Sequence, residues 1–551
     1  MCTEVCNGHI SVSGLFGFSS LHFEVANAIN RGDDIYVQQY LDNRKWEHEE
    51  ELHYYLNYSL ALSHSEGNQI MVKIFLLWIC KEFTKLHQPC NVSVWAANIS
   101  TEGSANEIPI LVCNYWVDVD KKFRDKCFFG LPVIYQEYNT VNEEEMYVQG
   151  SKMFLESALS PIDAMQANEI VALNTDWLIQ SYSNLEVIKP CPVRSACLEV
   201  KKETCIVLYC RMKGFIPFGE KPFPKTLYAG EKSFPVDVRE GFYVPAMFQE
   251  TTDVIDDEIS WDSHLFRMGL SMGPIEKEIS ATVGPFVQME GNNVGFLTCA
   301  HAFGVPCNIR TALEMPVVQP AKGEFASVNP VPVGESICGY VEKIAFDIDP
   351  NNPVNVDAAL IRLKPEKVPQ MGRFAWMNPR SLEAAGLKAG QSLSFDHGEI
   401  VMKENVGEIL SEPGKIIKVG AASGVTSSNL LDPGRVVIRI GKAELSHEHG
   451  HIFLPISGGT RCYVMKGQYL VRSRPINVFL SSGDSGAGVF YMDKLQKLRC
   501  IGIAIGFLSN TFEAVVTPIE DVLRALELDE SALMRFNVHY IYRREHRQQM
   551  S

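Results

Sequence analysis

A Gly-Asp-Ser-Gly turn at residues 483–486 holds Ser485 between two apolar runs, and a serine in such a place could act as a nucleophile. Gly483 and Gly486 have no Cβ atom, so the backbone there can adopt a positive φ and come close to a bound group. Such a turn can direct backbone N–H groups at one point, which an oxyanion hole requires. The same four residues also fit an ordinary tight turn, so the motif needs partners before it indicates catalysis.

Two other side chains, both from earlier in the chain, are of the types that would activate this serine. His301 follows the apolar run 296–300, and Asp357 opens the apolar run 358–363. A serine nucleophile needs a neutral imidazole to accept its proton. The imidazole in turn needs a buried carboxylate to fix its tautomer and to stabilise its charged form. Each residue alone also fits a structural role, His301 in a core after a strand and Asp357 at a strand edge.

The chain order of these residues, His301, then Asp357, then Ser485, separates the known types of serine hydrolase. It is the order of the chymotrypsin family and not that of subtilisin or of the α/β-hydrolases. The α/β-hydrolase motif Gly-x-Ser-x-Gly also fails locally, because Ala487 stands where that motif has its second glycine.

Residues from about 275 to 527 resemble a trypsin-like serine protease domain of the chymotrypsin fold. Residues 298–301, Thr-Cys-Ala-His, resemble the family's Thr-Ala-Ala-His. Residues 357–361, Asp-Ala-Ala-Leu-Ile, resemble its Asp-Ile-Ala-Leu-Leu, and the turn at 483–486 is identical to its nucleophile motif. Three matches in the right order are far less expected by chance than any one of them.

The composition is that of a globular protein with several domains. The chain has 551 residues, of which 46% are hydrophobic and 21% charged, and its formal net charge is −16. That charge argues against a general binder of nucleic acid or anionic membranes, since both attract clustered lysine and arginine. The first residues show no secretory signal pattern, and the apolar run 74–80 is too short to span a bilayer. We therefore predict a cytoplasmic protein with protein or peptide substrates and no nucleic-acid or membrane partner.

The 15 cysteines are scattered, a pattern that predicts mostly free, buried thiols in a reducing compartment. Digestive relatives in the family carry a cysteine directly after the catalytic histidine, whereas this chain has Ala302 there. The resemblance is therefore to the disulfide-free, intracellular members.

Four segments are expected along the chain. Helical periodicity from about residue 34 to 87, followed by strand-like runs and further helices, predicts an α+β N-terminal region of unknown type at residues 1–246. An acidic linker is expected at residues 247–270. The resemblance implies an all-β, chymotrypsin-like double β-barrel with a C-terminal helix at residues 271–527, and residues 528–551 would form a C-terminal tail.

Two groups of potential metal ligands have simpler explanations. The first group consists of four cysteines, Cys191, Cys197, Cys205 and Cys210. Of these, Cys205 and Cys210 are five residues apart on one predicted strand, so they point to opposite faces and cannot easily share a tetrahedral ion. The other group consists of three alternating histidines, His447, His449 and His451. On a strand they would share one face, as a metal site needs, but the glycine among them favours a solvated loop. We expect no cofactor and no metal, although the histidine group leaves a metal site open.

The resemblance places the residue at the base of the substrate pocket six positions before the nucleophile, at Phe479. The strand lining the cleft would contribute Ala504, Ile505 and Gly506. None of these residues is charged, and a cationic side chain buried without a partner is strongly destabilised. We predict cleavage after an uncharged, apolar residue, or only after glycine or alanine if the ring of Phe479 fills the pocket.

Activation is expected to differ from that of digestive relatives, in which a newly cut N-terminus pairs with the aspartate before the nucleophile. Asp484 keeps that carboxylate, but residues 268–273 lack the family's Ile-Val-Gly-Gly start. We predict that the uncut chain is already competent or is gated by its N-terminal half. The run 418–426 is similar to a strand pair of intracellular members, with Ser423 where threonine is common.

The favoured hypothesis is an intracellular serine endopeptidase, with regulation by its own N-terminal region as one option. Ser485 would attack a peptide carbonyl, His301 would pass the proton to the leaving amine, and Asp357 would orient His301. Backbone N–H groups of Gly483 and Ser485 would bind the oxyanion. One alternative is a catalytically silent protein that uses the protease fold as a binding or regulatory module. Another is a self-processing protein that cuts its own linker and then rests.

Overall fold

The computed structural model describes residues 20–536 with gaps. The residues outside the description are 1–19, 45–48, 63–68, 87–91, 100–108, 116–125, 138–141, 197–198, 247–265, 277–278, 304–313, 322–336, 346–355, 376, 378, 390, 392, 413, 442–461, 473–477, 510, 512 and 537–551. Most of the predicted acidic linker, the three alternating histidines and most of the C-terminal tail therefore lie outside the described residues.

The chain forms two compact units. The first takes in the described residues from 20 to 137 together with 214–222, and the second takes in the other described residues. The four segments predicted from the sequence, with a boundary after residue 246, stay a prediction.

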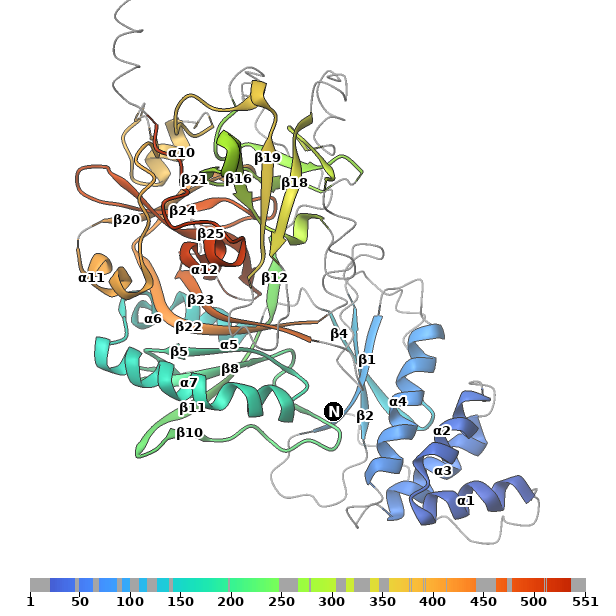
Figure 1. Cartoon of the computed structure of the whole chain (residues 1–551). Helices are drawn as coiled ribbons and strands as arrows, with labels where there is room; N and C mark the ends of the chain where they lie inside the picture. The colour runs from blue at the N-terminus through green and yellow to red at the C-terminus, as the bar shows by residue number, and fades with distance from the viewer. Residues whose placement is uncertain are drawn as a thin grey trace, which may run out of the picture. The chain divides into compact units, whose positions relative to one another are not determined.

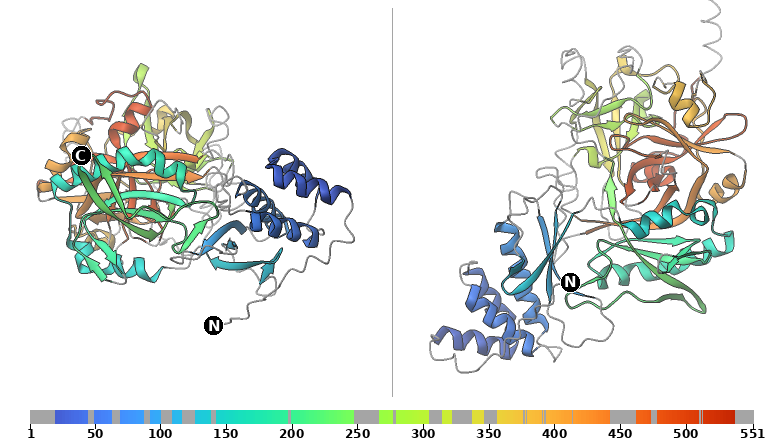
Figure 2. Two further views of the ribbon diagram at one scale, coloured as in Figure 1. Left: turned by 90° about the horizontal axis from the view of Figure 1, so that it is seen from below. Right: turned by 180° about the vertical axis from the view of Figure 1, so that it is seen from behind.

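The first unit is an α+β structure, with helices early in the chain and one mixed sheet after them (Figure 2). Its helices are α1 (Ser20–Arg31), α2 (Asp34–Asp42), α3 (Glu49–Leu62) and α4 (Gln69–Leu86). Its strands are β1 (Val92–Ile99), β2 (Ile110–Tyr115), β3 (Cys127–Phe128), β4 (Leu131–Glu137) and β9 (Phe215–Pro217), in the order β3-β4-β2-β1-β9. The helical periodicity read from residue 34 to 87 is confirmed by α2, α3 and α4. In α4 the buried residues Phe75, Ile79 and Phe83 recur every fourth position, which turns one face into the core.

The second unit begins with helices that cover strands (Figure 1). These helices are α5 (Glu143–Gly150), α6 (Lys152–Glu156) and α7 (Pro161–Ser181). The strands that follow are β5 (Leu185–Cys191), β6 (Arg194–Ala196), β7 (Glu199–Lys201), β8 (Cys205–Cys210), β10 (Thr226–Ala229), β11 (Lys232–Glu240) and β12 (Tyr243–Pro245). Pro161 is the first residue of α7, and the Ser160 hydroxyl caps this helix by accepting a hydrogen bond from the N–H of Asp163 at 3.0 Å.

Two larger sheets build most of the second unit. A seven-stranded sheet has the order β14-β13-β17-β18-β19-β16-β15. Its strands are β13 (Ser271–Pro274), β14 (Ala281–Thr282), β15 (Phe286–Gln288), β16 (Val294–Thr298), β17 (Pro316–Val318), β18 (Ile337–Ala345) and β19 (Ala358–Leu363). The described chain is thus mostly β in this region, while closure into two barrels stays a prediction.

The other is a twelve-stranded sheet that runs β10-β11-β8-β5-β22-β23-β26-β25-β24-β20-β21, with β12 paired to β25. Its later strands are β20 (Lys415–Gly420), β21 (Gly424–Ser428), β22 (Leu430–Gly441), β23 (Cys462–Arg472), β24 (Gly488–Met492), β25 (Leu498–Leu508) and β26 (Glu513–Pro518). Because β5 pairs with β22, at Ile188 and Val437, strands from both sides of residue 246 belong to one sheet.

Short helices complete the second unit: α10 (Pro379–Ala384), α11 (Val406–Ser411) and α12 (Ile519–Ala525). The helix α12 agrees with the C-terminal helix that the resemblance implies. No helix among the described residues combines the length and the hydropathy needed to cross a bilayer. Those cysteines that the structure places are free, and all except Cys127 are buried, as the scattered pattern predicts.

Candidate active site

Ser485 lies in a tight turn that leads into β24, and two glycines shape that turn. Gly483 and Gly486 have φ values of +95° and +91°, in the left-handed region that side chains avoid, as the motif predicts. A Cβ atom at Gly486 would also lie 2.1 Å from the hydroxyl of Thr298 at the end of β16. The turn therefore packs closely against β16, the strand that leads to His301.

Neighbouring strands bring His301 and Asp357 side by side. β16 ends at Thr298, three residues before His301, and β19 begins directly after Asp357. Thr298 is paired with Ala359 across these two strands, so both functional residues lie at the same end of the strand pair. The Asp357 Oδ1 atom accepts the backbone N–H groups of Ala300 at 2.7 Å and of His301 at 3.0 Å, and Oδ2 is hydrogen-bonded to His301 Nδ1. The carboxylate is thus held in place and fixes the orientation of the imidazole.

The other ring nitrogen of His301 faces the serine. His301 Nε2 lies 2.9 Å from Ser485 Oγ, within hydrogen-bond reach. The hydroxyl of Ser485 is also positioned to donate to the carbonyl oxygen of Ile505 at 3.1 Å. All three side chains of the predicted triad are almost completely buried, at 1% exposure or less. The structure thus brings together Ser485, His301 and Asp357.

Charge on the imidazole is favoured by its surroundings. Burial by itself lowers the pKa of His301, but Asp357, with a smaller contribution from Cys299, raises that pKa well above 6.5. When the ring is charged, Nε2–H donates to Ser485 Oγ while the serine hydroxyl donates to Ile505. When the ring is neutral, Nε2 can accept the serine proton, as a general base must.

The backbone N–H groups predicted to bind an oxyanion both point at one carbonyl oxygen. Gly483 N donates to Ala246 O at 2.8 Å, and Ser485 N approaches the same oxygen at 3.4 Å. The N–H of Ala246 donates to Ile505 O at 3.2 Å. Ala246 directly follows β12, so a segment of the chain itself lies across the site. Sequence reasoning missed this residue, because no local pattern marks it.

The predicted pocket residues are all packed in the interior near that alanine or its neighbour Pro245. Phe479, Ala504 and Ile505 are completely buried, and Gly506 pairs with Pro245 of β12. Ala246 belongs to the same hydrophobic cluster as Phe479 and Ala504. The side chains of this cluster are apolar, and their role as a substrate pocket stays a prediction.

Behind the nucleophile, Asp484 is bound on every side. Its carboxylate accepts Lys418 Nζ at 2.7 Å and the Ser423 hydroxyl at 2.6 Å. It also accepts the N–H groups of Ala422 and Ser423, both at 3.0 Å, and of Ser481 at 2.9 Å. Lys418 and Asp484 are fully buried. Burial lowers the pKa of Lys418 below its usual value, although the charge of Asp484 acts in the opposite direction. The sequence singled out these positions by resemblance but did not reveal the pairing.

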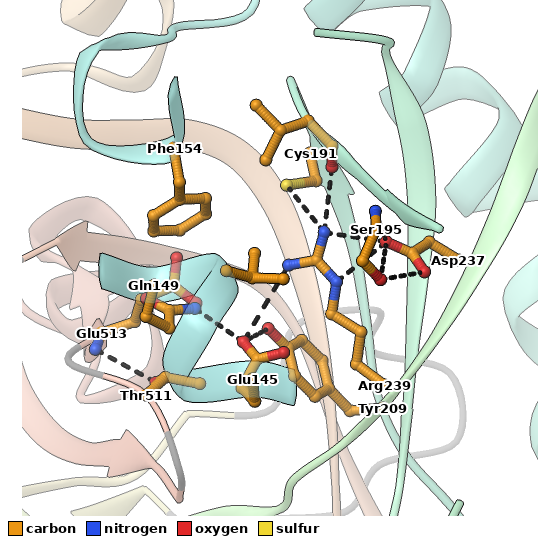
Figure 3. Close-up of polar contacts among 12 residues, drawn as sticks. Glu145, Gln149, Phe154, Cys191, Ser195, Tyr209, Asp237, Arg239, Thr511 and Glu513 are labelled. Carbon is orange, nitrogen blue, oxygen red and sulfur yellow. Dashed lines mark hydrogen bonds and ion pairs between the residues drawn. The ribbon is translucent and has the colours of Figure 1, made fainter. Parts of the chain in front are cut away.

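A second buried polar cluster anchors the strand that precedes β12. Figure 3 shows Arg239 of β11 at its centre, with Nε 2.9 Å from Asp237 Oδ2. Asp237 also accepts the backbone N–H of Ser195 at 2.8 Å, and Tyr209 donates to Glu145 at 3.0 Å. Arg239 is 2% exposed, so the charge is held by partners and not by water. The cluster holds β11 in place, and none of these hydrogen bonds involves Ser485.

Metal binding finds no support among the residues that the structure covers, where no three His, Cys, Asp or Glu side chains gather to hold an ion. His447, His449 and His451 lie outside those residues, so the question about them is unchanged. Cys191 and Cys205 face each other across β5 and β8. Burial raises the pKa of Cys191, but a hydrogen bond from Cys205 and the charge of Arg239 together lower it to about 6.

No protein-family model matches the chain, and no curated protein matches its sequence. Among solved structures, the chain is similar to the crystal structure of Nocardiopsis protease (NAPase), a chymotrypsin-fold protease, with a TM-score of 0.25 and 12% identity. The match covers 48% of this chain and 96% of the Nocardiopsis chain. A likeness this weak carries no argument about activity, so a functional proposal depends on the geometry of the site.

Proposed function

We propose that the chain is a serine endopeptidase that uses Ser485 as nucleophile, on a double β-barrel of the chymotrypsin type. The observation that carries the proposal is the continuous contact from Asp357 through His301 to Ser485, beside two N–H groups directed at one carbonyl oxygen. These are the groups that acyl transfer needs: a nucleophile, a base, an orienting carboxylate and oxyanion donors.

The reaction follows from the positions of the atoms. Neutral His301 accepts the proton of Ser485 as Oγ bonds to the peptide carbonyl carbon. The N–H groups of Gly483 and Ser485 stabilise the negative charge that develops on the carbonyl oxygen. Charged His301, held by Asp357, then gives the proton to the leaving amine. Water releases the acyl group by the same steps in reverse.

An internal lysine supports competence without a prior cut. In the proposed fold the carboxylate beside the nucleophile needs a buried cation to hold the oxyanion turn. Lys418 supplies one, 2.7 Å from Asp484. Since Lys418 belongs to the continuous chain, no new N-terminus is required, in agreement with the prediction that the uncut chain is competent.

The preferred substrate has a small apolar residue before the scissile bond. Phe479 is completely buried and shares its cluster with Ala246, so the pocket already holds a ring. Of the two options raised from the sequence, we therefore adopt the second: Phe479 leaves room only for glycine or alanine before the scissile bond.

The proposal is tested with a fluorophosphonate probe, which labels activated serines irreversibly. The wild-type chain should be labelled on Ser485, and Ser485→Ala should show no labelling while keeping its circular dichroism spectrum. Turnover of a peptide with alanine before the scissile bond should fall by about 10⁴- to 10⁶-fold in the same variant. Equal labelling of the two proteins would show that Ser485 is not the nucleophile.

A further inference from the structure

The short strand β12 lies along β25 beside Ser485, as an extended peptide substrate would. It pairs antiparallel with β25, with Tyr243 opposite Leu508 and Pro245 opposite Gly506. Addition of a strand to a sheet edge is a general way to hold a peptide through its main chain. A Cβ atom at Gly506 would lie 2.4 Å from the carbonyl oxygen of Val244, so a glycine there allows the close approach.

The residue after β12 is seated where the reacting carbonyl belongs. The carbonyl oxygen of Ala246 accepts from Gly483 N at 2.8 Å and faces Ser485 N at 3.4 Å, while its N–H donates to Ile505. Donors of an oxyanion hole surround the oxygen of the carbonyl group that the nucleophile attacks. The carbonyl group of Ala246 therefore occupies the position of the carbonyl group that the nucleophile would attack in a substrate.

The side chain of Ala246 fits the pocket, and few others would. It has no exposed surface, and it shares its hydrophobic cluster with Phe479 and Leu480 of the pocket base. A larger side chain at residue 246 would have to displace packed atoms, which well-packed interiors resist. The segment therefore satisfies the small-residue preference as well as the main-chain contacts.

The position of this segment is fixed by the strand before it. Arg239 and Asp237 hold β11 in the buried cluster of Figure 3. Gly241 N then donates to Cys210 O at 2.9 Å, and Phe242 exchanges two hydrogen bonds of 2.8 Å with Ser509. Only three residues separate Phe242 from Ala246, so the chain is delivered to its own site and needs no collision with another molecule.

We infer that the chain is its own substrate: Ser485 cleaves the peptide bond after Ala246 in the same molecule. The inference rests on the proposed function. Ser485 Oγ bonds to the Ala246 carbonyl carbon, the bond to the nitrogen of residue 247 breaks, and His301 transfers the serine proton to that nitrogen. Water then attacks the ester, returns a proton to Ser485 through His301, and leaves Ala246 with a free carboxylate.

After the cut, the new C-terminus stays in the cleft. β12 keeps its pairing with β25, and the preceding strands remain in the twelve-stranded sheet through β5 and β22. Because the released carboxylate still faces the oxyanion donors, it competes with any other substrate. The segment therefore limits access of other substrates both before and after the cut.

The test is the intact mass of the full-length chain under denaturing conditions. Wild type should yield fragments 1–246 and 247–551, and Ser485→Ala should yield only the whole chain. Ala246→Gly should still be cut, whereas Ala246→Phe should be cut at least about 10²-fold more slowly. The matched control Ala384→Phe, on the exposed side of α10, should be cut like wild type. A tenfold dilution should leave the rate unchanged, as for an intramolecular reaction.

Several results would overturn the inference. They are a wild-type chain that stays whole at residue 246, a cut that persists in Ser485→Ala, and a cut unaffected by Ala246→Phe. Fluorophosphonate labelling separates this failure from that of the proposed function. If Ser485 is labelled but the chain stays uncut, the proposed peptidase function holds and the inference of self-cleavage fails. In Ala246→Phe the segment no longer fits the site, so Ser485 should be labelled faster than in wild type. Absence of labelling in both proteins would refute the proposed peptidase function as well.

Discussion

At the scale of single residues, the protonation state of His301 controls what the site can do. The ring lies between Asp357 and Ser485, and the serine hydroxyl has a second acceptor in Ile505 O. Protonation of the ring turns Nε2 from an acceptor into a donor. The serine then keeps its proton, and its oxygen is a poor nucleophile.

The first prediction concerns pH. Burial lowers the pKa of His301, but Asp357 outweighs it and raises the pKa well above 6.5. The rate of fluorophosphonate labelling should therefore rise with pH and reach half its maximum above pH 6.5. The charged ring stabilises the folded chain fully below its unfolded pKa, near 6.5. That stabilisation should be lost as pH rises through the folded pKa, in the range where labelling increases.

The control for this profile is Asp357→Asn, measured with the same probe. It should lower labelling by about 10⁴-fold, since the imidazole loses its orienting carboxylate. The residual labelling should reach half its maximum at a lower pH than in wild type. A wild-type midpoint at or below pH 6.5 would contradict the assignment of Asp357 as the group that raises this pKa.

At the scale of elements, β20 and the turn before β24 are joined by the ion pair of Lys418 and Asp484. The second prediction is that Lys418→Met disorders the oxyanion turn, because it leaves a buried carboxylate without its cation. Breaking a buried pair costs about 3–5 kcal/mol. Labelling of Ser485 should fall by at least 10²-fold and the thermal midpoint should drop. Lys415→Met is the matched control on the same strand, since Lys415 Nζ donates to Ala385 and Gly386 at the surface.

The third prediction concerns the same turn at Gly486. Gly486→Ala should remove labelling and destabilise the second unit, because the new Cβ would lie 2.1 Å from the Thr298 hydroxyl at a φ of +91°. Gly467, which is also in the second unit, has a φ of +81° and open space around it, so Gly467→Ala isolates the backbone strain. That strain costs about 1–2 kcal/mol. Equal losses of stability in the two variants would show that the contact with Thr298 does not matter.

At the scale of the whole molecule, the twelve-stranded sheet carries strands from both sides of residue 246. Lys189 of β5 forms a buried ion pair with Glu513 of β26, and both side chains are at most 1% exposed. The fourth prediction is that Lys189→Met lowers the stability of the second unit by roughly 3 kcal/mol or more, since Glu513 loses its main partner. Lys466→Met, which removes an exposed pair with Asp176, should cost about 0–1 kcal/mol. Denaturant unfolding of both variants gives the comparison, and similar midpoints would contradict it.

The amino-acid sequence allowed much of the local structure to be predicted. Helical periodicity located α2, α3 and α4. The glycines of the nucleophile turn have the positive φ values that their type suggested. These features could be predicted because each depends on neighbours within a few residues, where periodicity, capping and backbone freedom act directly.

The sequence by itself determined which side chains could do chemistry: it named Ser485, His301 and Asp357 and an uncharged pocket around Phe479. Only the tertiary structure decided what surrounds them. It paired Lys418 with Asp484, joined β5 to β22, and laid Ala246 against the oxyanion donors. Ala246 lies more than two hundred residues from Ser485 in the chain. No spacing or composition encodes such a contact, because it arises from strand pairing and packing that the whole fold sets.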